Sequence, residues 1–356
     1  MSAAADFARE HIAGRDWHAH DVIPAELWRA LADAGLLGLE GGWRDLSHAC
    51  RDLAEAGGNQ GIAMSVMAHN LVPRLHLRRL GTQTQQDRLL PGLARGEHGM
   101  AVAISEPGAG AHPKLLKTRA VHDGDGWRLD GEKAYVSNGP LADHAIVLAI
   151  TDEVDGRKQF TGFLVPLDTA GVSRTAGVHI DFLRPMPHCG LKLDNVHLPA
   201  DAIIGPEGDA FAAISLPMRR VEDAVGLGTT VGALRHELAL VAQGLGDNSS
   251  DDDRARLGQL LETVDALAVL ADTAAERLDA HGIDTPGLEA LADAGKSLAK
   301  QVQDSLTGWP AKWDNAAPPD LARVAHDLDK SLNIAGAAYR ARRMKAADAW
   351  LKRQQR

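Results

Sequence analysis

The pattern of hydrophobic and polar positions divides the chain into three parts. In residues 1–99, apolar side chains recur at helical spacing, and glycines close several of the helical stretches. In residues 100–205, apolar positions alternate with period two between turn dipeptides such as Asp130-Gly131 and Asn138-Gly139. Helical stripes return in residues 206–356. We therefore predict an α+β protein of three domains: an N-terminal helical domain, a middle domain built on a sheet and a C-terminal helical bundle.

No helical pattern separates the strand-like stretches HAIVLAI (144–150), FTGFLVPL (160–167) and GLKLDNVHLP (190–199). This succession favours an antiparallel sheet, closed as a small barrel or folded as a sandwich. Near the end of the chain, PDLARVAHDLDKSLNIAGAAYRARRMKAADAWL (319–351) keeps one apolar stripe and is predicted as a single long helix of the bundle.

Composition narrows the possible partners and the compartment. The chain has 356 residues, of which 45% are apolar and only 4% aromatic, so leucine, alanine and valine must fill the core. A net charge of −10 argues against binding to nucleic acids or to anionic membranes. The N-terminus lacks the apolar stretch of a signal peptide, and no apolar run is long enough to span a bilayer. We expect a soluble, cytoplasmic protein.

Two short motifs suggest ligands but lack the required context. GLGTTVG (226–232) has the glycine spacing of a dinucleotide-binding loop, yet the charged stretch RRVEDAV precedes it where a buried strand is needed. We interpret these small residues as a site of close helix packing. WHAH (17–20) pairs two histidines, but no convergent cysteine or carboxylate set accompanies them, so we predict no metal site.

A pair of motifs in the middle part carries more information. SEPGAGAHPK (105–114) follows the apolar run MAVAI, and GEKAYVSNG (131–139) comes about twenty residues later. Together they resemble the acyl-CoA dehydrogenase family, and this resemblance implies an N-terminal helical domain, a middle antiparallel β-barrel and a C-terminal four-helix bundle in the same order. GLKLDNVHLPADAIIGPEGDAF (190–211) resembles the segment that leads from the sheet into the bundle, and PMRRVEDAVGLGTTVGALRHEL (217–238) resembles the helix with the family's buried arginine, here Arg219.

The resemblance implies an FAD site and an acyl-thioester site. Ser105 would contact the pyrimidine edge of the flavin, Tyr135 would stand at a position usually held by tryptophan, and Ser137 would lie beside flavin N5. The cofactor-binding positions implied in this way are Val102, Ile104, Ser105, Gly110, Ala111, Tyr135 and Ser137. Those implied for substrate are Ala111, Arg219 and Ala335.

The catalytic base of the family is missing from its usual position. Such enzymes remove a proton alpha to a thioester carbonyl, which requires a carboxylate of raised pKa. In HDLDKSLNIAG (326–336), Ala335 occupies the position where most members of the family have this glutamate. Other members carry the glutamate directly before the buried arginine, and that position is Met218 here. Glu222 lies one helical turn beyond Met218 and is the remaining candidate, although a surface position is more usual for such a residue.

The resemblance implies an FAD-dependent oxidoreductase of fatty acid metabolism that acts on the CH–CH group of an acyl thioester. The expected partners are acyl-CoA or another acyl thioester, further copies in a homodimer or homotetramer, and electron-transfer flavoprotein as a possible electron acceptor. Because Ala335 replaces the base, a hetero-oligomer with a related subunit is an alternative. A flavin-dependent monooxygenase and a non-catalytic thioester-binding subunit are further alternatives.

Overall fold

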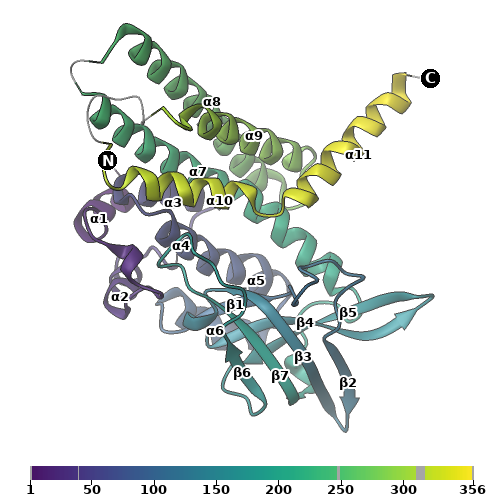
Figure 1. The fold of residues 1–356 in the computed structure, drawn as a ribbon. Coiled ribbons are helices and arrows are strands. Elements are labelled where there is room, and N and C mark those ends of the chain that lie inside the picture. Colours follow the sequence, from purple (N-terminus) through teal and green to yellow (C-terminus); the bar gives the residue numbers. More distant parts are fainter. Residues whose placement is uncertain (1, 39, 247–248, 310–316, 355–356) are drawn as a thin grey trace.

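The computed structural model describes residues 2–38, 40–246, 249–309 and 317–354. Helices from both ends of the chain pack together above a curled sheet (Figure 1). The predicted order of a helical part, a sheet and a second helical part is therefore confirmed. The helices of the first part are α1 (Ala3–His11), α2 (Ala25–Asp33), α3 (Trp43–Gly57), α4 (Gln60–Val72), α5 (Arg78–Leu80) and α6 (Gln83–Ala94).

The middle part is a seven-stranded sheet with the order β1-β4-β2-β3-β7-β6, and β5 pairs with β4 outside this path. Its strands are β1 (Met100–Ala103), β2 (Arg119–Asp123), β3 (Gly126–Ser137), β4 (His144–Val154), β5 (Arg157–Pro166), β6 (Val172–Thr175) and β7 (His188–Pro199). One apolar cluster fills the inside of the sheet, and a second joins it to α4 and α6.

The prediction of a wholly antiparallel sheet is wrong for β4. This strand pairs in parallel with β1 over Met100–Ala103 and touches β2 in parallel at one position. A parallel pair needs a long crossover connection, which is usually helical. Here the β2–β3 hairpin lies within the crossover, so no helical pattern marks it in the sequence.

The C-terminal part consists of long helices, of which all but the last share one apolar core with α1 to α4. They are α7 (Leu216–Leu245), α8 (Asp251–His281), α9 (Leu288–Leu306), α10 (Leu321–Asn333) and α11 (Gly336–Gln354). The single long helix predicted over 319–351 is in fact α10 and α11. Ala335 breaks it with a left-handed φ of 60°, a conformation that an L-residue adopts at a cost. Helix α11 leaves the body of the molecule at this break (Figure 1).

The interpretation of GLGTTVG as a packing motif is confirmed. A Cβ atom on Gly228 would lie 2.4 Å from the carbonyl oxygen of Ser47, and one on Gly232 would lie 2.1 Å from that of Arg51. Both partners belong to α3, which therefore packs directly against the backbone of α7. This contact holds the first helical part on the helix that carries Arg219 and Glu222.

Candidate functional site

A buried ion pair anchors the loop that follows β1. The Glu106 carboxylate lies 2.9 Å from the Lys133 ammonium group, and neither side chain is more than 5% exposed. Glu106 also accepts hydrogen bonds from the main-chain N–H groups of Lys117 and Thr118, and Lys133 donates to the carbonyl oxygen of Ile104. Three segments of the SEPGAG…KT…GEK pattern are thereby tied together directly beside Ser105.

Burial lowers the pKa of Lys133 to about 8, and the negative charge of Glu106 acts in the opposite direction. Burial also works against ionisation of Glu106, but Lys133 and Thr118 outweigh it and hold the pKa of the carboxyl below its ordinary value. The pair is thus ionised near pH 7. A buried pair of this kind is costly to break because one charge would be left without a partner.

The SNG turn connects the same rim to α4. Asn138 has a left-handed φ of 55°, a conformation that asparagine tolerates better than most residues. Its side-chain oxygen accepts from the Ser65 hydroxyl at 2.8 Å, and its side-chain nitrogen donates to the Ser65 carbonyl at 2.9 Å. These two bonds place the end of β3, with Ser137, against the helix that forms the opposite wall.

Between the sheet and the bundle lies a cavity of about 180 Å³, which we call the rim cavity. The sheet side supplies the hydroxyl groups of Ser105, Tyr135 and Ser137, and no described residue hydrogen-bonds to them. Helices α4 and α7 supply the opposite side. The residues that line the rim cavity are Met64, Met67, Ala68, Val102, Ile104, Ser105, Ala111, Tyr135, Ser137, Leu183, Met186, His188, Ser215, Met218, Arg219, Glu222 and Ile334.

Glu222 points into this cavity from α7, although the sequence favoured a surface position for it. Its side chain is 37% exposed, and that exposed part lines the rim cavity and a second, smaller cavity behind it. Burial raises the pKa of Glu222 above its ordinary value, and the neighbouring Asp223 raises it further. The opposing charges of Arg219, 3.5 Å away, and Lys296 limit the rise.

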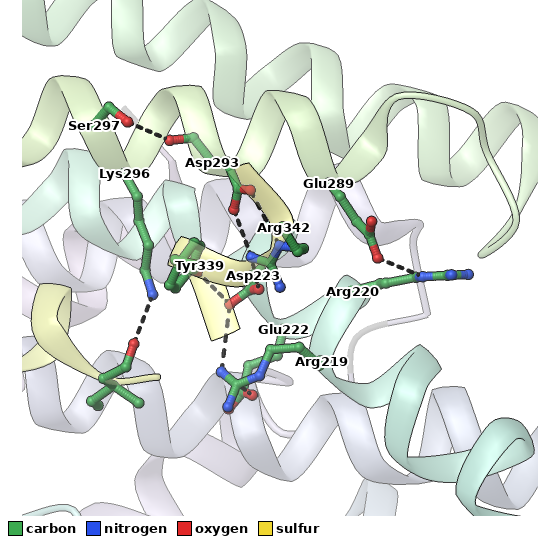
Figure 2. A network of polar contacts seen from close by, with 11 residues as sticks. Arg219, Arg220, Glu222, Asp223, Glu289, Asp293, Lys296, Ser297, Tyr339 and Arg342 are labelled. Atoms are coloured by element: carbon green, nitrogen blue, oxygen red, sulfur yellow. Dashed lines mark hydrogen bonds and ion pairs between the residues drawn. The ribbon is translucent and has the colours of Figure 1, made fainter. Parts of the chain in front are cut away.

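Asp223 forms the centre of the network shown in Figure 2. Its carboxylate accepts from the Tyr339 hydroxyl at 2.8 Å and from Arg342 at 3.2 Å, and it lies 3.5 Å from Arg219. Arg342 also pairs with Asp293 of α9 at 2.6 Å. The network therefore attaches the first turns of α11 to α7 and α9 next to Glu222.

The structure brings most of the residues implied by the resemblance to the rim cavity. Val102, Ile104, Ser105, Ala111, Tyr135, Ser137 and Arg219 all line it. Gly110 does not; it closes a tight turn through two main-chain hydrogen bonds with Glu106. Ala335 does not line the cavity either, whereas the preceding Ile334 does. Glu106, Lys133 and Lys296 are important neighbours that the sequence analysis did not single out.

The two histidines of WHAH belong to a different region. The buried Trp17 indole N–H donates to the Ile12 carbonyl at 2.8 Å, and His18 lies in a separate cavity beside His326 and Asp327.

Within the described residues, no group of three or more His, Cys, Asp or Glu side chains is arranged to hold a metal ion. In the same residues, no helix combines the length and the apolar character needed to cross a membrane.

Comparison with protein families agrees with this geometry. The model of the acyl-CoA dehydrogenase N-terminal domain matches residues 1–97, and that of the acyl-CoA dehydrogenase middle domain matches residues 101–196. The chain belongs to the acyl-CoA dehydrogenase family. The resemblance based on SEPGAG and GEKAYVSNG is thereby confirmed at the level of the family.

Individual members of the acyl-CoA dehydrogenase family are moderately similar to this chain. Acyl-CoA dehydrogenase FadE12 of Mycobacterium tuberculosis is 30% identical over 224 residues, which are 60% of this chain and 56% of that protein. Isovaleryl-CoA dehydrogenase of Arabidopsis thaliana is 30% identical over 229 residues, 61% of this chain and 56% of that protein. The matched region thus spans about half the length of these curated relatives.

Solved structures of acyl-CoA dehydrogenases resemble nearly the whole chain. Butyryl-CoA dehydrogenase from Megasphaera elsdenii has a TM-score of 0.83 at 20% identity, covering 98% of this chain and 96% of that one. A glutaryl-CoA dehydrogenase from Mycobacterium smegmatis in complex with FADH2 has a TM-score of 0.76 at 25% identity, covering 93% and 89%. The first comparison establishes the fold, including the C-terminal helices that the domain models do not reach.

Proposed function

We propose that this chain is an FAD-dependent oxidoreductase that removes a proton and a hydride from adjacent carbons of an acyl thioester, with Glu222 accepting the proton. The observation that carries the proposal is that Glu222 is the sole carboxylate among the described residues lining the rim cavity. It stands across that cavity from the Ser105, Tyr135 and Ser137 hydroxyls. A carboxylate in such a setting, with a raised pKa, is suited to act as a general base.

The other titratable groups of the cavity are poorer proton acceptors. Burial lowers the pKa of His188 to about 4, although a hydrogen bond with the main chain of Met186 acts in the opposite direction. This imidazole is therefore a weak base. Burial raises the pKa of Tyr135 to about 12, and the charge of Glu222 adds to the effect, so the phenol stays protonated. Arg219 remains a cation. Glu222 is therefore the group best able to take a proton near neutral pH.

The rim cavity fits a flavin ring. Its volume of about 180 Å³ corresponds to roughly 12 to 18 water-sized occupants, the scale of a fused three-ring system. The sulfur-containing side chains Met64, Met67 and Met186 offer apolar contact, and the open hydroxyls of Ser105 and Ser137 offer hydrogen bonds at the ring edge. When bound there, FAD supplies the acceptor for the hydride that leaves the β carbon.

The residues of the chain perform the proton chemistry. A carboxylate oxygen of Glu222 takes the proton from the α carbon, and the electron pair of that C–H bond forms the new C–C double bond as the hydride departs. Arg219 stays within 3.5 Å of Glu222 and favours its ionised form before the reaction. Met64, Met67 and Met218 make the helical side apolar, so a bound substrate would displace water there and strengthen these electrostatic interactions. Ala335 contributes no side chain to this step.

The proposal is tested by loading the purified chain with FAD and mixing it anaerobically with a series of saturated acyl-CoA thioesters. We expect the spectrum of stoichiometrically bound oxidised flavin, and we expect at least one thioester to bleach it. A protein that binds no FAD at any concentration would contradict the proposal and favour the non-catalytic alternative. Oxygen uptake with added reduced flavin, without thioester oxidation, would instead favour the monooxygenase.

The identity of the electron acceptor and the assembly state follow from the resemblance and stay predictions. Electron-transfer flavoprotein is the acceptor we expect, and a homodimer or homotetramer is the assembly we expect. A hetero-oligomer is no longer needed to provide a base, because Glu222 of this chain reaches the cavity.

A further inference from the structure

Behind the rim cavity lies a second, smaller cavity, which we call the inner cavity. The two share the side chains of Met64, Met67, Arg219, Glu222 and Ile334, so a chain that passes Glu222 enters the inner cavity next. Its volume is about 70 Å³, which corresponds to roughly five to seven water-sized occupants. This space suits the far end of a short acyl chain.

One wall of the inner cavity carries a buried amide oxygen without a partner. Gln60, in the first turn of α4, is 6% exposed, and its side-chain nitrogen donates to the Ser331 hydroxyl at 3.1 Å. That hydroxyl in turn donates to the carbonyl oxygen of Leu328 at 3.0 Å. Because Ser331 has its single proton committed, the Gln60 amide cannot be reversed without losing a bond. Its oxygen is therefore a buried acceptor without a partner among the described residues, on a side chain that lines the inner cavity.

A second wall carries a buried hydroxyl without a partner. Thr229 of α7 is 1% exposed, and no described residue hydrogen-bonds to its hydroxyl. The next residue is different, because the Thr230 hydroxyl donates to the Gly226 carbonyl of the same helix at 3.1 Å. Buried polar groups without partners are rare and costly in native proteins. Two of them in one small cavity indicate that a polar group of a ligand completes the hydrogen bonding.

The charges around the cavity favour a neutral group over an ion. Lys296 of α9 reaches the cavity with one weak contact, 3.5 Å from the Ile334 carbonyl, and lies 3.9 Å from the centre of the Tyr339 ring (Figure 2). Together with Arg219 it faces two carboxylates, Glu222 and Asp223. The two positive side chains and the two carboxylates leave the wall of the inner cavity without net charge. An added carboxylate would lie beside these two acids and the Gln60 oxygen, whereas a hydroxyl can both donate and accept.

We propose that the acyl group of the substrate is short and carries a hydroxyl toward its far end, which the inner cavity binds. The hydroxyl donates to the Gln60 amide oxygen and accepts from the Thr229 hydroxyl. This inference rests on the proposed function for the position of the thioester, and it adds the chemical class of the acyl group.

The test uses CoA thioethers, which lack the thioester carbonyl and are not oxidised. S-(6-hydroxyhexyl)-CoA, S-hexyl-CoA and the S-(5-carboxypentyl) analogue are titrated into the FAD-loaded chain by calorimetry. We expect the hydroxylated analogue to bind at least about tenfold more tightly than the other two, because a site built for a hydroxyl leaves its polar groups unpaired with an alkyl chain. The variant Thr229→Val should reduce this preference several-fold. Thr263→Val on α8 is the control and should keep it, because the Thr263 hydroxyl donates to the Gln259 carbonyl at 2.8 Å and Thr263 does not line the inner cavity.

Equal binding of the hydroxylated and alkyl analogues, or tighter binding of the carboxylated one, would overturn the inference. Such a result would leave the proposed function standing, because that is judged by FAD loading and anaerobic bleaching. A preference for the hydroxylated analogue that persists unchanged in Thr229→Val would also overturn the inference that the inner cavity binds the hydroxyl. If none of the three analogues binds, the inference fails, and bleaching by simple acyl-CoA thioesters decides separately whether the proposed function does.

Discussion

The pH dependence of stability is predicted to change when Glu237 is replaced by glutamine. Glu237 lies in α7, is 1% exposed, and accepts a hydrogen bond from the Gln303 side chain of α9. Burial raises its pKa from 4.5 to about 7, and the bond from Gln303 acts in the opposite direction. Between pH 4.5 and about pH 7, Glu237 therefore keeps its proton in the native protein and loses it in the unfolded chain.

The sign and size follow from this difference. Where the native state binds one proton more, the free energy of unfolding falls by about 1.4 kcal/mol per pH unit as pH rises. The stabilisation is fully present below pH 4.5 and is lost by the time pH exceeds the folded pKa of about 7. Glutamine cannot titrate. The advantage of Glu237→Gln over the natural chain should therefore grow by about 2 to 3 kcal/mol between pH 5 and pH 8.

Urea unfolding followed by tryptophan fluorescence at several pH values measures this change. Glu262→Gln on α8 is a matched control, because Glu262 is exposed and its replacement should alter stability little at any pH. A stability difference between Glu237→Gln and the natural chain that stays constant from pH 5 to pH 8 would refute the reasoning.

Two further substitutions test the frame of the site. Lys133→Met leaves the Glu106 carboxylate buried without its partner 2.9 Å away, and we expect the free energy of unfolding to fall by about 3–5 kcal/mol. Lys133→Met combined with Glu106→Gln should recover part of this loss. No recovery in the double variant would argue against the ion pair. Gly232→Val places side-chain atoms against the Arg51 carbonyl oxygen, which would lie 2.1 Å from Cβ, so thermal unfolding should show a loss of at least about 2 kcal/mol. A neutral effect there would argue against the α3–α7 contact.

The sequence predicted the parts of the site that depend on local motifs. Ser105, Tyr135 and Ser137 lie within SEPGAG and GEKAYVSNG, and the structure gathers all three on one wall. The glycines of GLGTTVG were assigned correctly because the charged residues before them exclude a buried strand. These conclusions needed no knowledge of how distant segments meet.

The remaining features depend on tertiary contacts. Helical periodicity placed Glu222 one turn after Met218, but only the packing of α7 against α4 and the sheet shows that this face lines a cavity. The break at Ala335 was missed because the apolar stripe continues through it. Lys296 resembles an ordinary solvated lysine in the sequence, and its position over the Tyr339 ring depends on where α11 is anchored.

The claim that Glu222 is the proton acceptor is tested most directly by Glu222→Gln in a single anaerobic turnover. The FAD-loaded natural chain should be bleached by an acyl-CoA thioester at a rate that rises with pH as Glu222 loses its proton. Glu222→Gln should keep its FAD and bleach about 10² to 10⁴ times more slowly. Glu289→Gln on α9, which removes a half-exposed carboxylate paired with Arg220, should bleach normally. Bleaching of Glu222→Gln at the natural rate would contradict the account.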